Sequence, residues 1–154
     1  MPESAPTSNN NQPKTLRTSG SVAMDDYLEQ ILQLSEKNDD NFARPVDISR
    51  KLGISQASVT KMLKRLKAEG LVNHEKYGGT TLTQKGHTIA HAIVMRHQTL
   101  TQFLRLFNID EKTIYSDVEG IEHHVSKATL NVITSLVAEL EDNPDLLERI
   151  KKKI

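Results

Sequence analysis

Three side chains that suit metal binding stand close together late in the chain, within residues 119–124 (EGIEHH). If this segment is helical, Glu119, Glu122 and His123 occupy positions i, i+3 and i+4 and share one face. Two carboxylates on one stripe repel each other unless a cation lies between them. The spacing therefore predicts a site for a divalent metal ion.

Three residues are too few for a six-coordinate ion, and three more candidates lie elsewhere in the chain. Asp26 and Glu29 are three residues apart in an expected helix, and His97 lies on the apolar stripe of another. Taken alone, the two acids also suit an ordinary surface and His97 also suits a packed core. They become candidate ligands because their helices must pack around the same core as residues 119–123.

The chemistry of the six candidates indicates which ions they suit. Four carboxylates balance the charge of two divalent cations, and the metal-free cluster should splay or protonate. Oxygen-rich ligation with a minority of imidazole suits Mn(II) or Fe(II). The chain has no cysteine, which argues against a typical structural zinc site.

Composition narrows the class of protein. The chain has 154 residues, of which 36% are hydrophobic and 26% charged, as in a globular protein with a modest core. Its apolar runs are too short to span a bilayer, and it begins without the apolar core of a signal peptide. We therefore expect a cytoplasmic protein with no membrane partner.

A net charge of zero hides an uneven distribution along the chain. Residues 1–43 hold 3 basic and 7 acidic residues, a balance of −4. Residues 44–96 hold 10 basic and 3 acidic residues, a balance of +7, and residues 97–154 hold 7 and 10, a balance of −3. The basic middle segment suits an anion-binding face, with nucleic acid the leading candidate, or an ordinary solvated surface.

The fold class expected from the pattern is mainly α. Residues 1–22 are rich in Ser, Thr, Asn, Pro and Gln and should form a disordered tail. Residues 23–85 are expected to form one domain and residues 86–154 a helical second one. Apolar periodicity and turn signals predict helices at about 24–38, 45–52, 56–69, 84–107, 110–125 and 127–140, with a short last helix after Pro144. Residues 71–77 and 80–83 predict a hairpin. Leu136 is expected to face the core.

The order helix, tight turn, helix, hairpin over residues 45–83 is that of a winged helix-turn-helix, whose second helix enters the major groove of DNA. A compact helical subdomain with a basic exterior is the alternative. Short polar residues can reach base edges, and lysines can meet phosphates. The candidate DNA contacts are Ser55, Gln56, Ala57, Thr60, Lys61, Lys64 and, at the hairpin tip, Lys76.

Several separated motifs resemble one known family. They are residues 24–30 (MDDYLEQ), 58–62 (SVTKM), 75–78 (EKYG), 96–97 (RH), 102–105 (QFLR) and 117–124 (DVEGIEHH). In order and spacing they closely resemble the manganese-responsive branch of the diphtheria-toxin-repressor family, over about residues 24–140. The resemblance implies a homodimeric, metal-activated transcriptional repressor, with a winged-helix DNA-binding domain and a helical metal-binding and dimerisation domain. It implies two metal ions per subunit, at positions that fall here on Asp26, Glu29, His97, Glu119, Glu122 and His123.

The same resemblance bears on the metal and on the partners. Iron-responsive relatives carry Met where Asp26 stands and Cys where Glu122 stands, and harder oxygen ligands favour manganese. The expected partners are an operator in double-stranded DNA and a second copy of the chain, with no small-molecule substrate, and the expected output is control of manganese uptake genes. The chain departs from the family in its longer N-terminal tail and short C-terminal helix, and it ends before the SH3-like domain of the iron branch.

Two other functions remain open from the sequence. An Fe(II)-responsive repressor of the same fold is the near alternative. A dinuclear-metal enzyme is the distant one, since four acids and two histidines can activate water. No spare general base is evident, and an enzyme would leave the winged helix unexplained. We therefore expect no enzymatic activity.

Overall fold

The structure, a computed structural model, describes residues 21–75 and 78–154, with side chains from Met24 onward. Residues 1–20 of the expected tail and the candidate DNA contact Lys76 lie outside the described residues. Ser21 and Val22, expected in the tail, already belong to the first helix. The described elements are α1 (Ser21–Lys37), α2 (Pro45–Leu52), α3 (Gln56–Ala68), β1 (Val72–His74), β2 (Thr80–Leu82), α4 (Gln84–Leu106), α5 (Glu111–Ile121), the 3-10 turn η1 (Glu122–His124), α6 (Lys127–Asp142) and α7 (Pro144–Lys151).

Local signals explain the boundaries of the first elements. Helix α2 begins with Pro45 in its first turn and ends at Gly53, whose φ of 64° is the left-handed conformation that glycine adopts without strain. Helix α3 begins after Ser55, whose side chain accepts a hydrogen bond from the Ser58 N–H and so caps the helix. The antiparallel hairpin pairs Val72 with Leu82.

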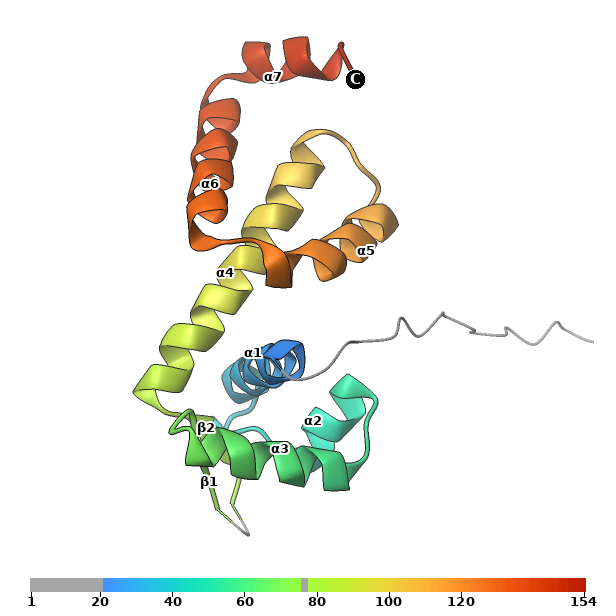
Figure 1. Cartoon of the computed structure of the whole chain (residues 1–154). Helices are drawn as coiled ribbons and strands as arrows, with labels where there is room; N and C mark the ends of the chain where they lie inside the picture. Colours follow the sequence, from blue (N-terminus) through green and yellow to red (C-terminus); the bar gives the residue numbers. More distant parts are fainter. Residues whose placement is uncertain (1–20, 76–77) are drawn as a thin grey trace, which may run out of the picture.

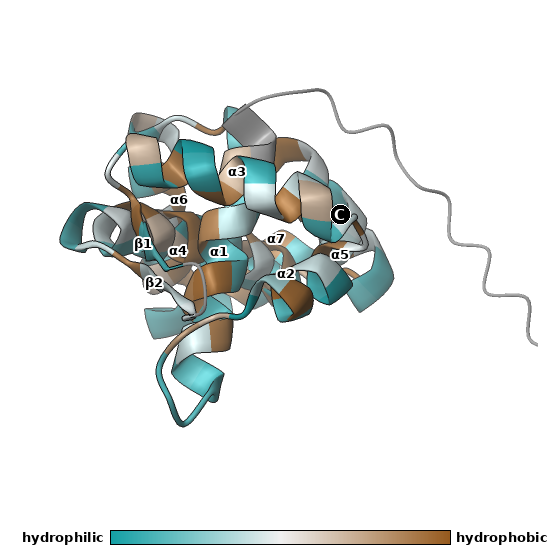
Figure 2. Cartoon of the chain, turned by 90° about the horizontal axis from the view of Figure 1, so that it is seen from below, coloured by the Kyte–Doolittle hydropathy of each residue, from teal (hydrophilic) through white to brown (hydrophobic). Residues whose placement is uncertain are grey.

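Helices α1, α2 and α3 and the hairpin form one lobe, here called the winged-helix lobe, at the lower end of the molecule in Figure 1. Its core includes Leu28, Ile31, Ile48 and Leu63, which are all but fully buried. Each helix alternates hydrophobic and hydrophilic segments along its ribbon, as expected when one side packs and the other meets water (Figure 2).

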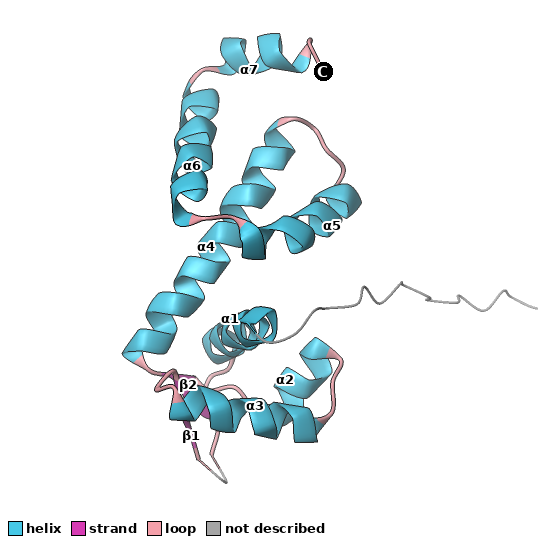
Figure 3. Cartoon of the chain, viewed as in Figure 1, coloured by secondary structure: helices cyan, strands magenta, loops and turns pink. Residues whose placement is uncertain are grey.

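Helix α4 connects this lobe to a second, the helical lobe of α5, η1, α6 and α7 (Figures 1 and 3). Near its beginning α4 packs against α1, and farther along it packs against α5 and α6. A second core of Leu100, Ile114 and Val118 joins α4 to α5. A single helix therefore spans both lobes, and residues at its middle lie at their junction.

The structure corrects two expectations. The helix expected over 110–125 ends at Ile121, and Glu122–His124 form a 3-10 turn instead. Leu136 is 46% exposed, because the buried side of α6 is set by Val137 and Leu140. No helix in the described ranges is long and apolar enough to cross a membrane.

Candidate functional site

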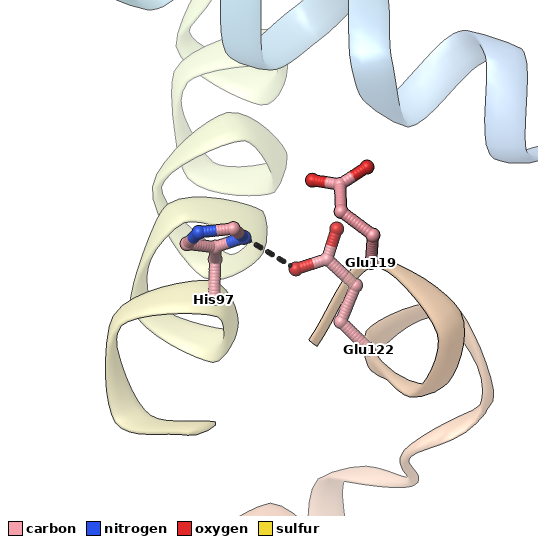
Figure 4. Close-up of side chains that lie close together, drawn as sticks. All are labelled: His97, Glu119 and Glu122. Carbon is pink, nitrogen blue, oxygen red and sulfur yellow. Dashed lines mark hydrogen bonds and ion pairs between the residues drawn. The ribbon is translucent and has the colours of Figure 1, made fainter. Parts of the chain in front are cut away.

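A compact group of potential metal ligands lies at the junction of the lobes. Helix α4 contributes His97, the end of α5 contributes Glu119, and η1 contributes Glu122 (Figure 4). One ligand atom from each lies within 4.8 Å of the other two. This is close enough for a single cation to contact all three after small side-chain movements.

Glu122 and His97 hold this group together. Nδ1 of His97 lies 2.7 Å from Oε2 of Glu122, a hydrogen-bonding distance. Glu122 is only 3% exposed, so its charge would be costly without this partner. The hydrogen bond to Glu122 raises the pKa of His97 above its ordinary value of 6.5, and the nearby charges of Glu29 and Glu119 act in the same direction.

Helix α1 brings Glu29 into the electrostatic field of the same group. Burial raises the pKa of Glu29 above its ordinary value of 4.5, and the charges of Glu122, Glu119 and Asp26 raise it further, while His97 lowers it. Such a concentration of carboxylates disfavours full ionisation unless positive charge is supplied. Glu29 also accepts a hydrogen bond of 3.0 Å from Gln33 Nε2, which steadies its side chain.

Asp26 and His123 stand at the edge of the site, outside the compact group of three. Asp26 is half-buried and also lines a groove with Ser58 and Lys61 of α3. His123 follows Glu119 by four residues, but the 3-10 turn replaces the regular helix that would have put both on one stripe. The structure therefore brings His97, Glu119 and Glu122 together, with Glu29 in their electrostatic field and with Asp26 and His123 outside the compact group.

One contact was missed from the sequence. Asp25 Oδ2 lies 3.5 Å from Nδ1 of His123, while Glu122 Oε1 lies 3.4 Å from its Nε2. Nδ1 of His123 is buried and makes no hydrogen bond within the described ranges. Asp25 precedes Glu29 by four residues and so shares its helical face, a signal that was available beside the chosen pair Asp26 and Glu29.

The residues present fit a divalent cation. The donors are mainly carboxylate oxygens with imidazole nitrogens, the set that suits Mn(II) and Fe(II). The carboxylate of Glu122 is buried, and the pKa of Glu29 is raised by burial and by the neighbouring acids, so a bound cation would stabilise this group of acids. The buried Nδ1 of His123 makes no hydrogen bond within the described ranges, so this imidazole has a polar atom still to be satisfied.

A second candidate surface lies on α3 and the hairpin. The six candidate DNA contacts of α3 and its cap, Ser55, Gln56, Ala57, Thr60, Lys61 and Lys64, are all exposed. The hydroxyl of Ser55 is engaged as the helix cap, and that of Thr60 donates to the Gln56 carbonyl. Their hydroxyls are therefore less available for bases than the amide of Gln56.

A groove of about 1000 Å³ runs between α3 and the hairpin and adds basic residues that the helix pattern did not indicate. Arg44 and Lys67 line it together with Lys64. Lys67 Nζ donates a hydrogen bond of 2.9 Å to the His74 carbonyl, so it lies along the hairpin. Arg44 precedes α2 and stacks over the Phe42 ring at 5.0 Å. Both belong to the segment with a +7 balance, which was the available signal.

Comparison with known proteins covers both lobes. Residues 21–80 match the family "Iron dependent repressor, N-terminal DNA binding domain", and residues 83–151 match "Iron dependent repressor, metal binding and dimerisation domain". The chain is 43% identical over 129 residues to the HTH-type transcriptional regulator MntR of Lysinibacillus sphaericus (strain C3-41), covering 84% of this chain and 91% of that protein. It is 44% identical over 121 residues to MntR of Bacillus subtilis (strain 168), covering 79% of this chain and 84% of that protein.

Solved structures show the same likeness. A manganese-dependent transcriptional repressor in complex with manganese matches with a TM-score of 0.66 and 28% identity, over 75% of this chain and 52% of that one. The manganese regulator SloR matches with a TM-score of 0.64 and 30% identity, over 75% and 53%. The chain thus spans about half the length of these two solved chains and most of the two MntR proteins.

Proposed function

The chain belongs to the iron-dependent repressor, or diphtheria-toxin-repressor, family as an MntR-type regulator, a metal-dependent DNA-binding repressor; from this premise we propose that Mn(II) is its activating ion and that manganese uptake genes are its targets. We also propose that it has no enzymatic activity and acts in the cytoplasm, where its operator lies. The matched relatives carry MntR in their names, which supports the choice of ion.

One observation carries this proposal. The compact group of His97, Glu119 and Glu122 lies where α4 joins the lobes, within the electrostatic field of Glu29 on α1. Helix α1 belongs to the winged-helix lobe, whereas Glu119 and Glu122 belong to the helical lobe. Side chains that bind one ion across this junction would fix how the two lobes sit relative to each other.

We propose that two Mn(II) ions are held by the six residues Asp26, Glu29, His97, Glu119, Glu122 and His123. The four carboxylates balance the charge of two divalent ions, and the oxygen-rich set favours Mn(II) through coordination number and geometry rather than raw affinity. When bound, the cations supply the positive charge that relieves the repulsion among these acids. We propose that Asp26 and His123 join the compact group through side-chain and local turn adjustments.

The DNA-binding form is proposed to be a homodimer that reads two half-sites. Gln56 and the other exposed residues at the beginning of α3 would face base edges, while Lys61, Lys64 and, from the sequence alone, Lys76 would meet phosphates. Two recognition helices must match the helical repeat of the operator, so misplaced lobes lose affinity. Allosteric coupling is typically about 1–3 kcal/mol, which is roughly 5- to 150-fold in affinity.

The dimer itself is supported by the match to a dimerisation domain and by apolar residues on the helical lobe. Val132 and Leu136 on α6 are 60% and 46% exposed, and they lie four residues apart on one flank of the helix. Exposed apolar residues that share a face mark association surfaces more often than isolated ones do. We propose that this flank contributes to the contact between subunits.

The test is DNA binding by the full chain under defined metal conditions. Fluorescence anisotropy with DNA from upstream of this gene and of nearby transporter genes would be run with Mn(II), with Fe(II) under anaerobic conditions, and with chelator, at one stated salt concentration. Tight binding with Mn(II) and weak binding with chelator is the expected result. Equal binding with chelator would contradict metal activation, and preferential binding with Fe(II) would establish the iron-responsive alternative.

A further inference from the structure

The imidazole of His123 lies between two carboxylates that come from different lobes. Asp25 on α1 faces its Nδ1 atom at 3.5 Å, and Glu122 on η1 faces its Nε2 atom at 3.4 Å. The His123 side chain is only 10% exposed, and that of Asp25 is 28% exposed. The ring is therefore held in a crevice in which each nitrogen meets its own acid.

The chemistry of imidazole decides which nitrogen can coordinate a cation. A neutral ring has one N–H donor and one lone pair, on different nitrogens. With the proton on Nδ1, Asp25 Oδ2 at 3.5 Å is the acceptor within reach, and a small movement would be needed to form a hydrogen bond. The Nε2 lone pair then faces the metal cluster. In the metal-free ring each tautomer leaves one lone pair against a carboxylate, either Nε2 against Glu122 or Nδ1 against Asp25. A cation held beside Glu122 would remove this symmetry, because a neutral ring that coordinates through Nε2 carries its proton on Nδ1, where Asp25 is the acceptor.

We propose that Asp25 is a positioning residue for His123: it fixes the Nδ1–H tautomer and so aims the Nε2 lone pair at the metal cluster. The inference deepens the proposed function, on which it rests, by adding a residue outside the six ligands. A carboxylate that accepts from the far nitrogen of a coordinating histidine orients the ring and raises its basicity. It is an independent tie between α1 and η1, because the other candidate contacts of α1 with the cluster come from Asp26 and Glu29.

The alternative is that Asp25 is a half-buried acid that lies near His123 by chance and has no effect on metal binding. The two readings differ in the tautomer of the metal-free ring and in metal affinity. Both quantities are measured in the absence of DNA. The test can therefore separate failure of this inference from failure of the repressor proposal.

The experiment uses the full chain and three variants on α1, two at position 25 and one at position 36. Long-range ¹H–¹⁵N NMR of the metal-free protein reports which nitrogen of His123 carries the proton, and electron paramagnetic resonance of free Mn(II) reports affinity. Asp25→Ala removes the acceptor, whereas Asp25→Asn keeps a carbonyl oxygen in its place. Glu36→Ala is the matched control, since Glu36 is an exposed acid at the far end of the same helix.

In the wild-type ring, Nδ1 is expected to carry a proton that faces Asp25. Asp25→Ala should shift the proton toward Nε2, where Glu122 is the remaining acceptor, and weaken Mn(II) binding by about 10- to 100-fold, as loss of an outer-sphere partner typically does. Asp25→Asn should restore part of the Nδ1 protonation of His123 and part of the Mn(II) affinity. Glu36→Ala should change neither quantity. Wild-type-like tautomer and affinity in Asp25→Ala would overturn the role of Asp25 and leave the repressor proposal intact. Absence of Mn(II) binding by the wild type would overturn the repressor proposal, while the metal-free tautomer would still decide whether Asp25 orients His123.

Discussion

His97 on α4 and Glu122 on η1 are joined by a hydrogen bond of 2.7 Å between Nδ1 and Oε2, across 25 residues of chain. The carboxylate of Glu122 is buried, and its other oxygen lies 3.4 Å from His123. Glu122 therefore lies between the two histidines of the candidate metal centre. Its removal should affect the site more than that of any half-exposed acid around it.

Glu122→Gln should abolish most Mn(II) binding while the chain stays folded. Glutamine has nearly the same shape and can still hydrogen-bond to His97, but it carries no charge and is a poor ligand. The loss of affinity should exceed the roughly 10- to 100-fold that outer-sphere changes cost. Isothermal titration with Mn(II) measures it, and a circular dichroism melt checks the fold. Wild-type affinity in this variant would remove Glu122 from the ligand set.

The raised pKa values predict how metal-free stability varies with pH. Burial and neighbouring acids raise the pKa of Glu29 above 4.5, so the folded state favours the protonated carboxyl. The contribution of Glu29 to the free energy of unfolding is full below pH 4.5 and is lost as the pH rises through the folded-state pKa. The contribution of His97 to the free energy of unfolding has the same sign. It is full below pH 6.5 and is lost as the pH rises through the raised pKa of His97.

Glu29→Gln tests this sign. In chelator, the neutral side chain should raise the melting temperature at pH values above the raised pKa of Glu29, and the gain should shrink as the pH falls through that pKa. With Mn(II) the order should reverse, because the variant lacks a ligand. Melting curves across pH, with and without metal, measure both. A melting temperature for Glu29→Gln at or below that of the wild type throughout, in chelator, would argue against carboxylate repulsion at the site.

On α3, Lys64 and Gln56 should contribute to DNA binding in different ways. Lys64→Ala should weaken binding to all sequences and lower the slope of log affinity against log salt by about 1, since one phosphate contact is lost. Gln56→Ala should cost about 1–3 kcal/mol on the operator and little on unrelated DNA, because a base contact is lost. Lys112→Ala, on the exposed surface of α5, is the control. An unchanged salt slope in Lys64→Ala would place that lysine away from the phosphates.

Association through α6 can be tested on its two flanks. Val132→Asp places a charge among the exposed apolar residues and should lower the dimer fraction at a given concentration. Thr134→Asp places the same charge on the other, exposed flank of the helix and should leave the dimer fraction unchanged. Sedimentation velocity distinguishes the two species. Equal dimer fractions in both variants would assign the contact between subunits to another surface.

Much of the fold was predictable because its signals are local. Pro45 and Gly53 bound α2, and Ser55 caps α3, each for a reason that depends only on neighbouring residues. Apolar spacing located the remaining helices, which is why the candidate ligands could be assigned to elements that pack together. The exposed position of Leu136 was missed because apolar spacing does not tell a core face from a surface that another subunit could cover.

The details of the site depend on contacts that spacing does not contain. A helical pattern over 110–125 does not distinguish a continuous α-helix from one that tightens into a 3-10 turn at Glu122. The contact between Asp25 and His123 joins residues almost a hundred positions apart, and only the packing of the lobes brings them together. Arg44 likewise reaches the groove beside α3 from a loop, where no periodicity points to it.

The central claim is that metal binding at the junction and DNA binding by α3 are thermodynamically coupled. It is tested most directly by titrating the full chain with Mn(II), with and without saturating operator DNA, at one salt concentration. Coupling is reciprocal, so operator DNA should raise Mn(II) affinity by the same factor by which Mn(II) raises DNA affinity, about 5- to 150-fold. An Mn(II) affinity that is identical with and without operator would contradict the account, because the metal would then have no influence on how the chain binds DNA.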